Sequence, residues 1–175
     1  MPTYTVNLFD QRSVLKVTQQ LDKYATDVEK AADLIASRLA DRGYDVAVSI
    51  MSGHVFSGET LGSLTVEKQG EGQYILYAES TALLFFEFGA GLRGGGHPWN
   101  DMFGMGPGTY PGQTHALSPN GWWYPTSDPR LTVRTDEKGQ GWGHSYGNPP
   151  YMPFYLAAED MRQHILDVAR EAFRT

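Results

Sequence analysis

The sequence predicts an α+β fold in which two long amphipathic helices pack on a small mixed or antiparallel sheet. Near both ends of the chain, apolar residues recur at steps of three and four, which is the spacing of one helix face. Short runs between these segments alternate apolar and polar residues, as half-buried strands do. A chain of 175 residues with 41% hydrophobic content can bury one core, so we expect a single domain over residues 1–175.

The first long helix is expected to begin near Ser13 and to stop at Gly43, because a glycine just past a periodic segment commonly ends a helix. At 1.5 Å per residue this helix would be about 40 Å long, which is more than a small core needs. It therefore either lies across a sheet or reaches a neighbouring chain. Its apolar face would consist of Val14, Val17, Leu21, Tyr24, Val28, Ala31, Ile35 and Leu39.

Three strands are expected to follow. Residues 45–51 place valine and isoleucine side chains on one face at period two, which predicts a half-buried strand, and residues 52–58 then form a loop. Residues 61–68 and 73–78 flank the turn sequence Q-G-E-G, so we interpret them as a hairpin.

A short apolar run with a single charge comes next. Residues 81–88 are too many for a tight turn and too apolar for a surface loop, which predicts a short helix buried almost all round. Ser80 is expected to cap its start, and Gly89 to supply the left-handed residue past its end. The carboxylate of Glu87 needs a partner or a route to water. It lies either on the one wet edge of the helix or in a polar contact at a subunit boundary.

Residues 92–148 form an insertion of different composition, which we call the aromatic arm. It contains all four tryptophans together with many glycines and prolines. Disordered linkers are poor in aromatic residues, so we expect a long loop or a β-ribbon whose indoles pack against other groups. Residues 131–135 are its best strand candidate, and residues 136–139 would form the adjacent turn.

The last helix is expected to begin near Pro153, whose missing N–H is not needed in a first helical turn. Acidic residues lie near its start and arginines near its end, as the helix dipole prefers. We expect it to pack beside the first helix. Its apolar face would consist of Phe154, Ala157, Met161, Ile165, Val168 and Ala172.

Composition excludes several classes of function. A formal net charge of −6 and a pI near 5.3 argue against a protein that grips nucleic acid phosphates, which requires a basic patch. The absence of cysteine excludes disulfides and thiolate chemistry and fits a reducing cytoplasm. The N-terminal residues lack a basic flank and an apolar core, and no apolar stretch approaches membrane-spanning length. We therefore expect a soluble protein made in the cytoplasm, without a signal peptide.

Two catalytic motifs occur without the context that their chemistry needs. Residues 89–94 spell the dinucleotide motif G-x-G-x-x-G, but Pro98 follows where a phosphate-binding helix would have to begin. Residues 143–147 spell the nucleophile elbow G-x-S-x-G around Ser145, and Asp160 and His164 follow in triad order. These two residues would lie one turn apart on one helix, which suits a surface pair better than a relay.

The remaining chemical signals are weaker. The five histidines show no metal-ligand spacing. The sequence W-W-Y at residues 122–124 invites a glycan-binding hypothesis, yet aromatic rings more often bury themselves or enter subunit contacts. We therefore expect no catalytic residues, no cofactor and no metal, and hence no enzyme. A small serine or metal-dependent hydrolase and a glycan-binding module remain the alternatives from other classes.

Two separated blocks carry a family resemblance. The first reads G-S-L-T at residues 62–65, Y-A at residues 77–78 and L-F-F-E-F-G-A-G at residues 84–91, and the second reads N-P-P-Y-M-P-F-Y-L-A-A at residues 148–158. They resemble the G-x-L, Y-A, V-E-F-G-T-G and P-P-F-M-x-x-A succession of the phage head-tail connector family of minor capsid and tail-component proteins. The expected order of elements also agrees. Ala90 stands where the family commonly has threonine, and Pro153 is an additional proline.

The resemblance implies a structural protein of the neck or tail of a long-tailed phage virion, synthesised in the host cytoplasm. Such a neck or tail-completion protein assembles as a ring, commonly hexameric, between the capsid portal complex and the tail, and double-stranded DNA passes through its lumen without sequence-specific binding. Its partners would be further copies of the chain, a neighbouring connector or stopper, and tail terminator or tail tube proteins, with no membrane. A tail terminator subunit is the alternative within this class.

Subunit contacts in such a ring are expected at the short apolar helix with its glycine exit and at the aromatic arm. An acidic wall also lets a polyanion slide past it. The expected contact residues are Glu87, Phe88, Gly89, Arg93, Trp122, Trp123, Tyr124 and Phe154.

Overall fold

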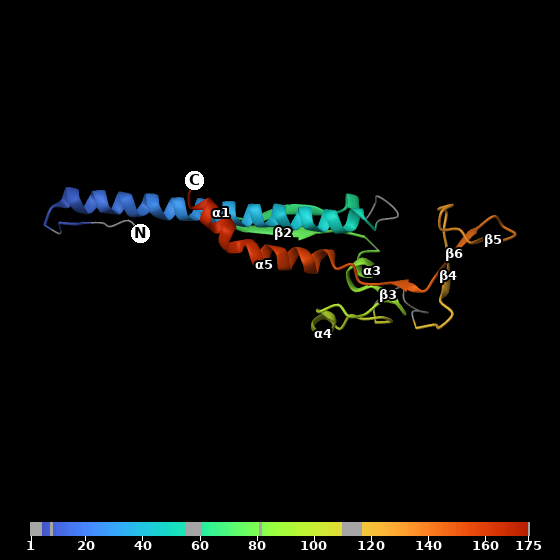
Figure 1. The fold of residues 1–175 in the computed structure, drawn as a ribbon. Coiled ribbons are helices and arrows are strands. Elements are labelled where there is room, and N and C mark those ends of the chain that lie inside the picture. The colour runs from blue at the N-terminus through green and yellow to red at the C-terminus, as the bar shows by residue number, and fades with distance from the viewer. Residues whose placement is uncertain (1–4, 8, 55–60, 81, 110–116, 175) are drawn as a thin grey trace.

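The structure, a computed structural model, describes residues 5–7, 9–54, 61–80, 82–109 and 117–174. It confirms the α+β fold, with two helices packed together beside small sheets whose described strand pairs are all antiparallel (Figure 1). The described elements in chain order are α1 Gln11–Ser52, β1 Thr65–Gly70, β2 Gln73–Tyr77, α3 Leu83–Phe88, β3 Ala90–Gly91, α4 Asn100–Phe103, β4 Trp122–Pro125, β5 Arg134–Thr135, β6 Gly141–Ser145, β7 Gly147–Asn148 and α5 Pro153–Ala172.

Helix α1 continues through Gly43, so the helix stop expected there is wrong. A Cβ atom at this position would lie 2.9 Å from Sδ of Met161 on α5. The glycine therefore permits α5 to approach α1 closely, and the packing offsets the roughly 1 kcal/mol that a glycine costs inside a helix.

The strand expected over residues 45–51 is also wrong, because this segment forms the last turns of α1. The buried residues in this part of α1 are Ala47 and Met51, which continue from the buried Gly43 at steps of four and so lie on one helix face. The alternating valine and isoleucine side chains are half-buried on either side of that face. Of the loop expected over residues 52–58, residues 53 and 54 form a turn after α1, and residues 55–58 lie outside the described part.

Helices α1 and α5 lie side by side, as the sequence predicts, and they run antiparallel (Figure 1). The guanidinium of Arg42 binds Asp160 near the start of α5, and Arg38 lies 3.6 Å from Glu171 near its end. Pro153 occupies the first turn of α5 as expected. One member of the expected apolar face is misplaced, since Ile165 is 47% exposed.

The hydrophobic core lies where α1, the hairpin and the start of α5 meet. Its fully packed members are small or flexible, which lets the elements approach closely: Ala47, Met51, Leu64 and Ala157. Larger half-buried side chains surround them, among them Tyr44, Leu61, Leu76 and Phe154. This core holds together only the C-terminal half of α1.

We call the first twenty residues of α1 the α1 overhang (residues 11–30), and most of this segment extends beyond α5 and the hairpin (Figure 1). Only its last turns approach them, since Asp27 and Lys30 line a hollow with Phe173 at the end of α5. Every side chain in the overhang is exposed or half-buried, and Ala31 is the first buried residue of the helix. At 1.5 Å per residue the overhang is about 30 Å long. A helix of this length was expected either to lie across a sheet or to reach a neighbouring chain. The first arrangement holds only for the second half of α1, which packs on the hairpin.

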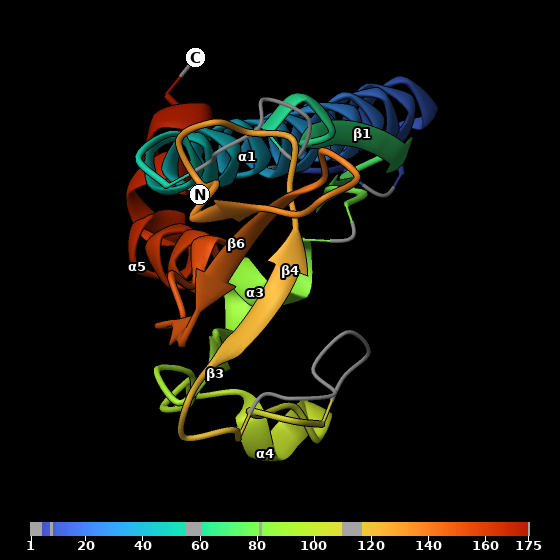
Figure 2. The same ribbon diagram turned by 90° about the vertical axis from the view of Figure 1, so that its right-hand side faces the viewer.

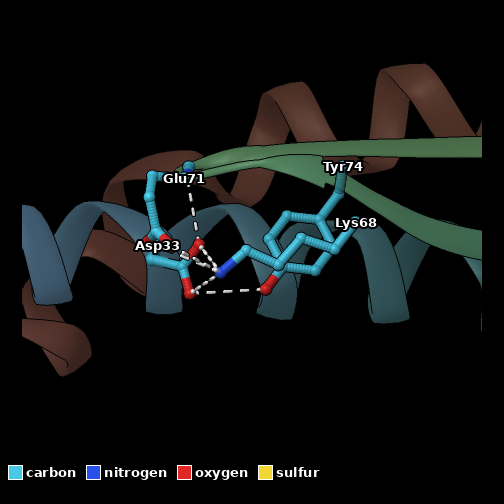
Figure 3. A network of polar contacts seen from close by, with 5 residues as sticks. Asp33, Lys68, Glu71 and Tyr74 are labelled. Atoms are coloured by element: carbon cyan, nitrogen blue, oxygen red, sulfur yellow. Dashed lines mark hydrogen bonds and ion pairs between the residues drawn. The ribbon is translucent and has the colours of Figure 1, made fainter.

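The predicted hairpin is confirmed, with β1 and β2 paired in the register Val66 to Leu76. Asp33 of α1 fastens the hairpin to the helix (Figure 3). Its carboxylate lies 2.8 Å from Nζ of Lys68 and accepts a hydrogen bond of 2.9 Å from the N–H of Gly72. These bonds, the one from Lys68 foremost, lower the pKa of Asp33, and the same contact raises the pKa of Lys68.

The predicted short apolar helix is confirmed as α3, although Thr81, where it was expected to begin, lies outside the described part. Its expected burial almost all round is wrong, because only Glu87 and Phe88 are buried and the other residues of the helix are half-buried.

The cap expected of Ser80 is wrong: Ala82 is the residue that precedes α3, and no side chain caps the helix start. Oγ of Ser80 instead accepts a hydrogen bond of 3.2 Å from the N–H of Ala82 in the turn before the helix. Gly89 has a positive φ of 76°, but its ψ of 178° is extended. The left-handed helical conformation expected for this glycine is therefore wrong.

The aromatic arm contains a three-stranded ribbon with the order β4-β6-β5, at the end of the molecule opposite the α1 overhang (Figures 1 and 2). Only Arg134 and Thr135 of the strand candidate at residues 131–135 form β5. Asp136 begins the expected turn, and its lowered pKa reflects first the hydrogen bond from Nε1 of Trp142 and then that from the N–H of Gln140. Residues 110–116 of the arm lie outside the described part.

Candidate functional site

Glu87 is 5% exposed and lies at the meeting point of α3, the following loop and α5. Its Oε2 accepts a hydrogen bond of 2.9 Å from the N–H of Phe154, and Oε1 accepts one of 2.9 Å from the N–H of Tyr155. The third donor is Nε2 of His97, 2.8 Å from Oε1. The wet edge expected for Glu87 is therefore wrong, because its carboxylate is buried and fully paired inside its own chain.

The two backbone donors belong to the first turn of α5, which begins at Pro153. The first N–H groups of a helix have no partner within the helix and carry the positive end of its dipole. The residue before the helix, Met152, has a positive φ of 59° and provides no side-chain cap. Glu87 supplies that cap from a distant part of the sequence.

His97 is 3% exposed, and its protonation follows from its neighbours. Nδ1 accepts a hydrogen bond of 3.0 Å from the N–H of Trp99, so the proton is on Nε2, which donates it to Glu87. The imidazole is thus neutral, and the acceptor oxygens of Glu87 lie at the positive end of the α5 dipole. The rings of Phe88, Trp99 and Tyr155 surround the imidazole at centroid distances of 4.6, 5.7 and 5.4 Å. We call these residues, with Glu87, the Glu87 hub.

The backbone around Gly89 joins this hub to the aromatic arm. A Cβ at Gly89 would lie 2.7 Å from the backbone nitrogen of Pro150, and one at Gly91 would lie 2.7 Å from the indole of Trp122. Directly after Gly89, the two residues of β3 pair with β7, Gly91 opposite Gly147. The tight chain crossing explains why small residues are needed after Phe88.

An apolar groove of about 300 Å³ lies beside the hub. Phe103, which forms part of its wall, is 54% exposed, and the neighbouring Met102 is 72% exposed. Exposed large apolar side chains that gather at one groove are typical of contacts between proteins. The other lining residues are Leu83, Leu84, Glu87, Phe88, Trp99, Met105 and Phe154.

A second hollow of about 390 Å³ lies between α3 and the ribbon. Arg93 and Tyr124 are part of its wall, together with Ser145 and His54, whose ring stacks on Tyr151 at 3.9 Å. Oγ of Ser145 accepts a hydrogen bond from the N–H of Gly147.

Trp123 is the outward-facing tryptophan of the ribbon and is 41% exposed. The guanidinium of Arg134 lies 4.0 Å from its ring, and the ring of His144 meets it edge-on at 4.7 Å. A guanidinium over the indole is a favourable cation–π contact. It also occupies a ring face that a sugar would need.

The eight expected contact residues thus fall into two groups. Glu87, Phe88, Gly89 and Phe154 meet at the Glu87 hub. The others, Arg93, Trp122, Trp123 and Tyr124, lie at or near the ribbon. Sequence reasoning missed His97 as the partner of Glu87, and no spacing signal in the sequence joins the two residues.

The hydrolase motif is not assembled in the described structure. Ser145 lies at the end of β6 and is followed by β7, with no helix after the turn. Asp160 and His164 lie on α5, where both contact Arg42, and His164 is 3.3 Å from Asp160 as a pair one turn apart. No three potential metal ligands gather among the described residues. None of the described helices is long and apolar enough to cross a membrane.

Comparisons of the chain with models of known families, with characterised proteins and with solved structures find no match.

Proposed function

We propose that the chain is a ring-forming structural subunit of a phage neck, a head-tail connector or tail-completion protein that joins the capsid portal complex to the tail. The observation that carries this proposal is the α1 overhang. Leu21 and Tyr24 are 48% and 47% exposed on a helix that extends about 30 Å past its own core. A helix with an apolar stripe of that length is stabilised by burying the stripe against another chain.

The sequence blocks that resemble the connector family support the same proposal. Glu87 of the first block accepts hydrogen bonds from Phe154 and Tyr155 of the second. The two blocks, which are far apart in the sequence, thus belong to one structural unit, the Glu87 hub. The groove beside the hub, with exposed Met102 and Phe103, offers a surface for a neighbouring copy or an adjacent ring.

The acidic balance fits a wall around passing DNA. With a net charge of −6, a ring of several copies would repel the phosphate backbone and leave the DNA free to move. No enzymatic step is needed for this role.

Light scattering after size-exclusion chromatography tests the proposal, together with electron microscopy of purified particles. We expect a ring of defined mass, and a density for the chain in the neck between portal and tail. A density at the end of the tail tube itself, below the neck, would favour a tail terminator subunit. A chain that stays at 19.4 kDa under all assembly conditions and is absent from particles would contradict the proposal.

A further inference from the structure

The hollow between α3 and the ribbon has the size of a small-molecule site. Its volume of about 390 Å³ lies within the range of about 300–1,000 Å³ that is usual for ligand pockets. Aromatic rings form much of its wall and come from segments far apart in the sequence: Phe85 and Phe86 of α3, Tyr124 of the ribbon, and His54 and Tyr151. A mainly apolar wall with a few polar groups is typical of a site that binds an organic molecule.

The charged member of this wall is Arg93, and no acidic side chain is among the described residues that line the hollow. Within the described part of the chain, the guanidinium of Arg93 has no hydrogen-bond or ion-pair partner. This is unexpected in a chain with 20 acidic and 14 basic side chains. Other arginines are paired with carboxylates of their own chain: Arg38, Arg42, Arg130, Arg162 and Arg170.

The backbone that carries Arg93 is held in a tight turn. The N–H of Gly94 donates a hydrogen bond of 3.1 Å to the carbonyl oxygen of Gly91, and a Cβ at Gly94 would lie 2.8 Å from the backbone nitrogen of Ala90. Arg93 itself is exposed, whereas the rings of the α3 phenylalanines and of Tyr124 are half-buried. The positive charge therefore lies nearer to the solvent than the rings do.

A hydrogen-bond donor in the same wall is the hydroxyl of Ser145. Its Oγ accepts a hydrogen bond of 2.9 Å from the N–H of Gly147, which leaves the hydroxyl proton to be donated. No acceptor for this proton is found among the described residues. The hollow thus offers a cation and a neutral donor, and both attract an acceptor that carries negative charge.

We propose that this hollow binds an aromatic carboxylate, with the carboxylate on Arg93 and the ring among the half-buried aromatic side chains. The planar fork of a guanidinium matches a carboxylate, and aromatic rings pack favourably on one another. A phosphate carries about −1.5 to −2 charges, more than one guanidinium neutralises, so a carboxylate fits better. The lining residues belong to one chain, so the inference goes beyond the proposed ring and does not depend on it.

Isothermal titration calorimetry of the full chain with phenylpropionate tests the site. Phenylpropionamide is the matched neutral probe, because it has the same ring and chain length but lacks the negative charge. We expect the acid to bind and the amide to bind more weakly by at least about tenfold, since a hydrogen bond to a charged group is stronger than one between neutral groups.

Two variants separate the charge from the space. Arg93→Gln should weaken binding of the acid by at least about tenfold and leave binding of the amide unchanged. Leu131→Trp adds a larger side chain to the wall and should abolish binding of both probes, with an unchanged circular dichroism spectrum showing that the fold is kept. Arg174→Gln, the same change at an exposed position near the end of the chain, is the control and should bind as the wild type does.

A further probe distinguishes two sources of the ligand. A short peptide that ends in phenylalanine carries the same ring and a carboxylate at a chain terminus. Tighter binding of this peptide than of phenylpropionate would identify the C-terminus of a partner protein as the source, and tighter binding of the free acid would identify a small molecule.

The inference is overturned if acid and amide bind the wild type equally well, because the hollow then recognises the ring and not the charge. It is also overturned if neither probe binds, if Arg93→Gln leaves binding of the acid unchanged, or if phenyl phosphate binds more tightly than phenylpropionate. None of these results changes the assembled mass of the wild-type chain, so the proposed ring is tested separately.

Discussion

At the scale of the residue, Glu87 holds three segments of the chain together by hydrogen bonds. Its three hydrogen bonds join α3, the loop at His97 and the first turn of α5, and the side chains of Glu87 and His97 are both buried. An ionised carboxylate tolerates such burial because each donor is directed at it, and the helix dipole adds to the attraction. The same side chain that seems out of place in an apolar run is thus the link between distant segments.

Glu87→Ala should lower the free energy of unfolding by about 3 kcal/mol, because two backbone N–H groups and His97 lose their buried acceptor. Glu87→Gln keeps an acceptor oxygen and should lose less. Thermal melting followed by circular dichroism measures both. Glu137→Ala, at an exposed position of the arm, serves as the control and should melt as the wild type does. Equal melting of Glu87→Ala and the wild type would refute this account of the hub.

At the scale of the element, the hairpin, the short apolar helix and the last helix were predictable because each has a local signal. The turn sequence, the apolar run and Pro153 identify themselves within a few residues. The C-terminal end of α1 was not predictable. The valine and isoleucine residues at period two indicated a strand, but Ala47 and Met51 at a step of four are compatible with a helix face. The contact between Gly43 and Met161, which explains why the helix continues through a glycine, is visible only in three dimensions.

Gly43→Val should lower the free energy of unfolding by about 1–3 kcal/mol, since the new side chain occupies the space of Met161. Met161→Ala in the same chain should recover part of the loss, and a double-mutant cycle from chemical denaturation measures the coupling. Ser49→Val introduces the same residue at an exposed position of α1 and controls for its helix propensity. Additive effects of Gly43→Val and Met161→Ala would show that the two residues are not in tight contact where α1 and α5 cross.

Acid should weaken the attachment of the hairpin to α1. Because the pKa of Asp33 in the folded chain lies below its ordinary value of 3.8, its contribution to stability is complete above that value and is lost as the pH falls through the lowered pKa. The melting temperatures of wild type and Asp33→Asn should therefore differ at about pH 7 and converge as the pH falls below the ordinary pKa of 3.8. Glu29→Gln, one turn earlier on α1, should follow the wild type at every pH. A constant difference would exclude Asp33 as the titrating group.

At the scale of the whole molecule, the core occupies the middle, the α1 overhang extends from one end and the aromatic arm from the other (Figure 1). The sequence indicates that the first helix is longer than a small core needs, although its expected end at Gly43 is wrong, and it indicates the unusual composition of the arm. Both features point beyond a single compact chain. It does not indicate the Glu87 hub, because the partners of Glu87 are set by tertiary contacts across 67 residues.

The chain should not retain linear double-stranded DNA in a gel-shift assay at physiological salt, because its net charge of −6 repels phosphate. Lowering the salt strengthens this repulsion, so binding should stay absent there too. Retarded DNA whose binding weakens as salt rises would reveal a basic surface that the folded chain assembles, and would contradict a passive wall.

The bonds between Glu87 and the start of α5 also set an order of events during synthesis. Phe154 is translated long after Glu87, so α3 leaves the ribosome with its carboxylate unpaired and its leucine and phenylalanine side chains uncovered. The hub is completed only when nearly the whole chain is available. Newly made chains therefore pass through a stage in which the arm is present but not yet anchored, and a chaperone that shields apolar segments would find its substrate there.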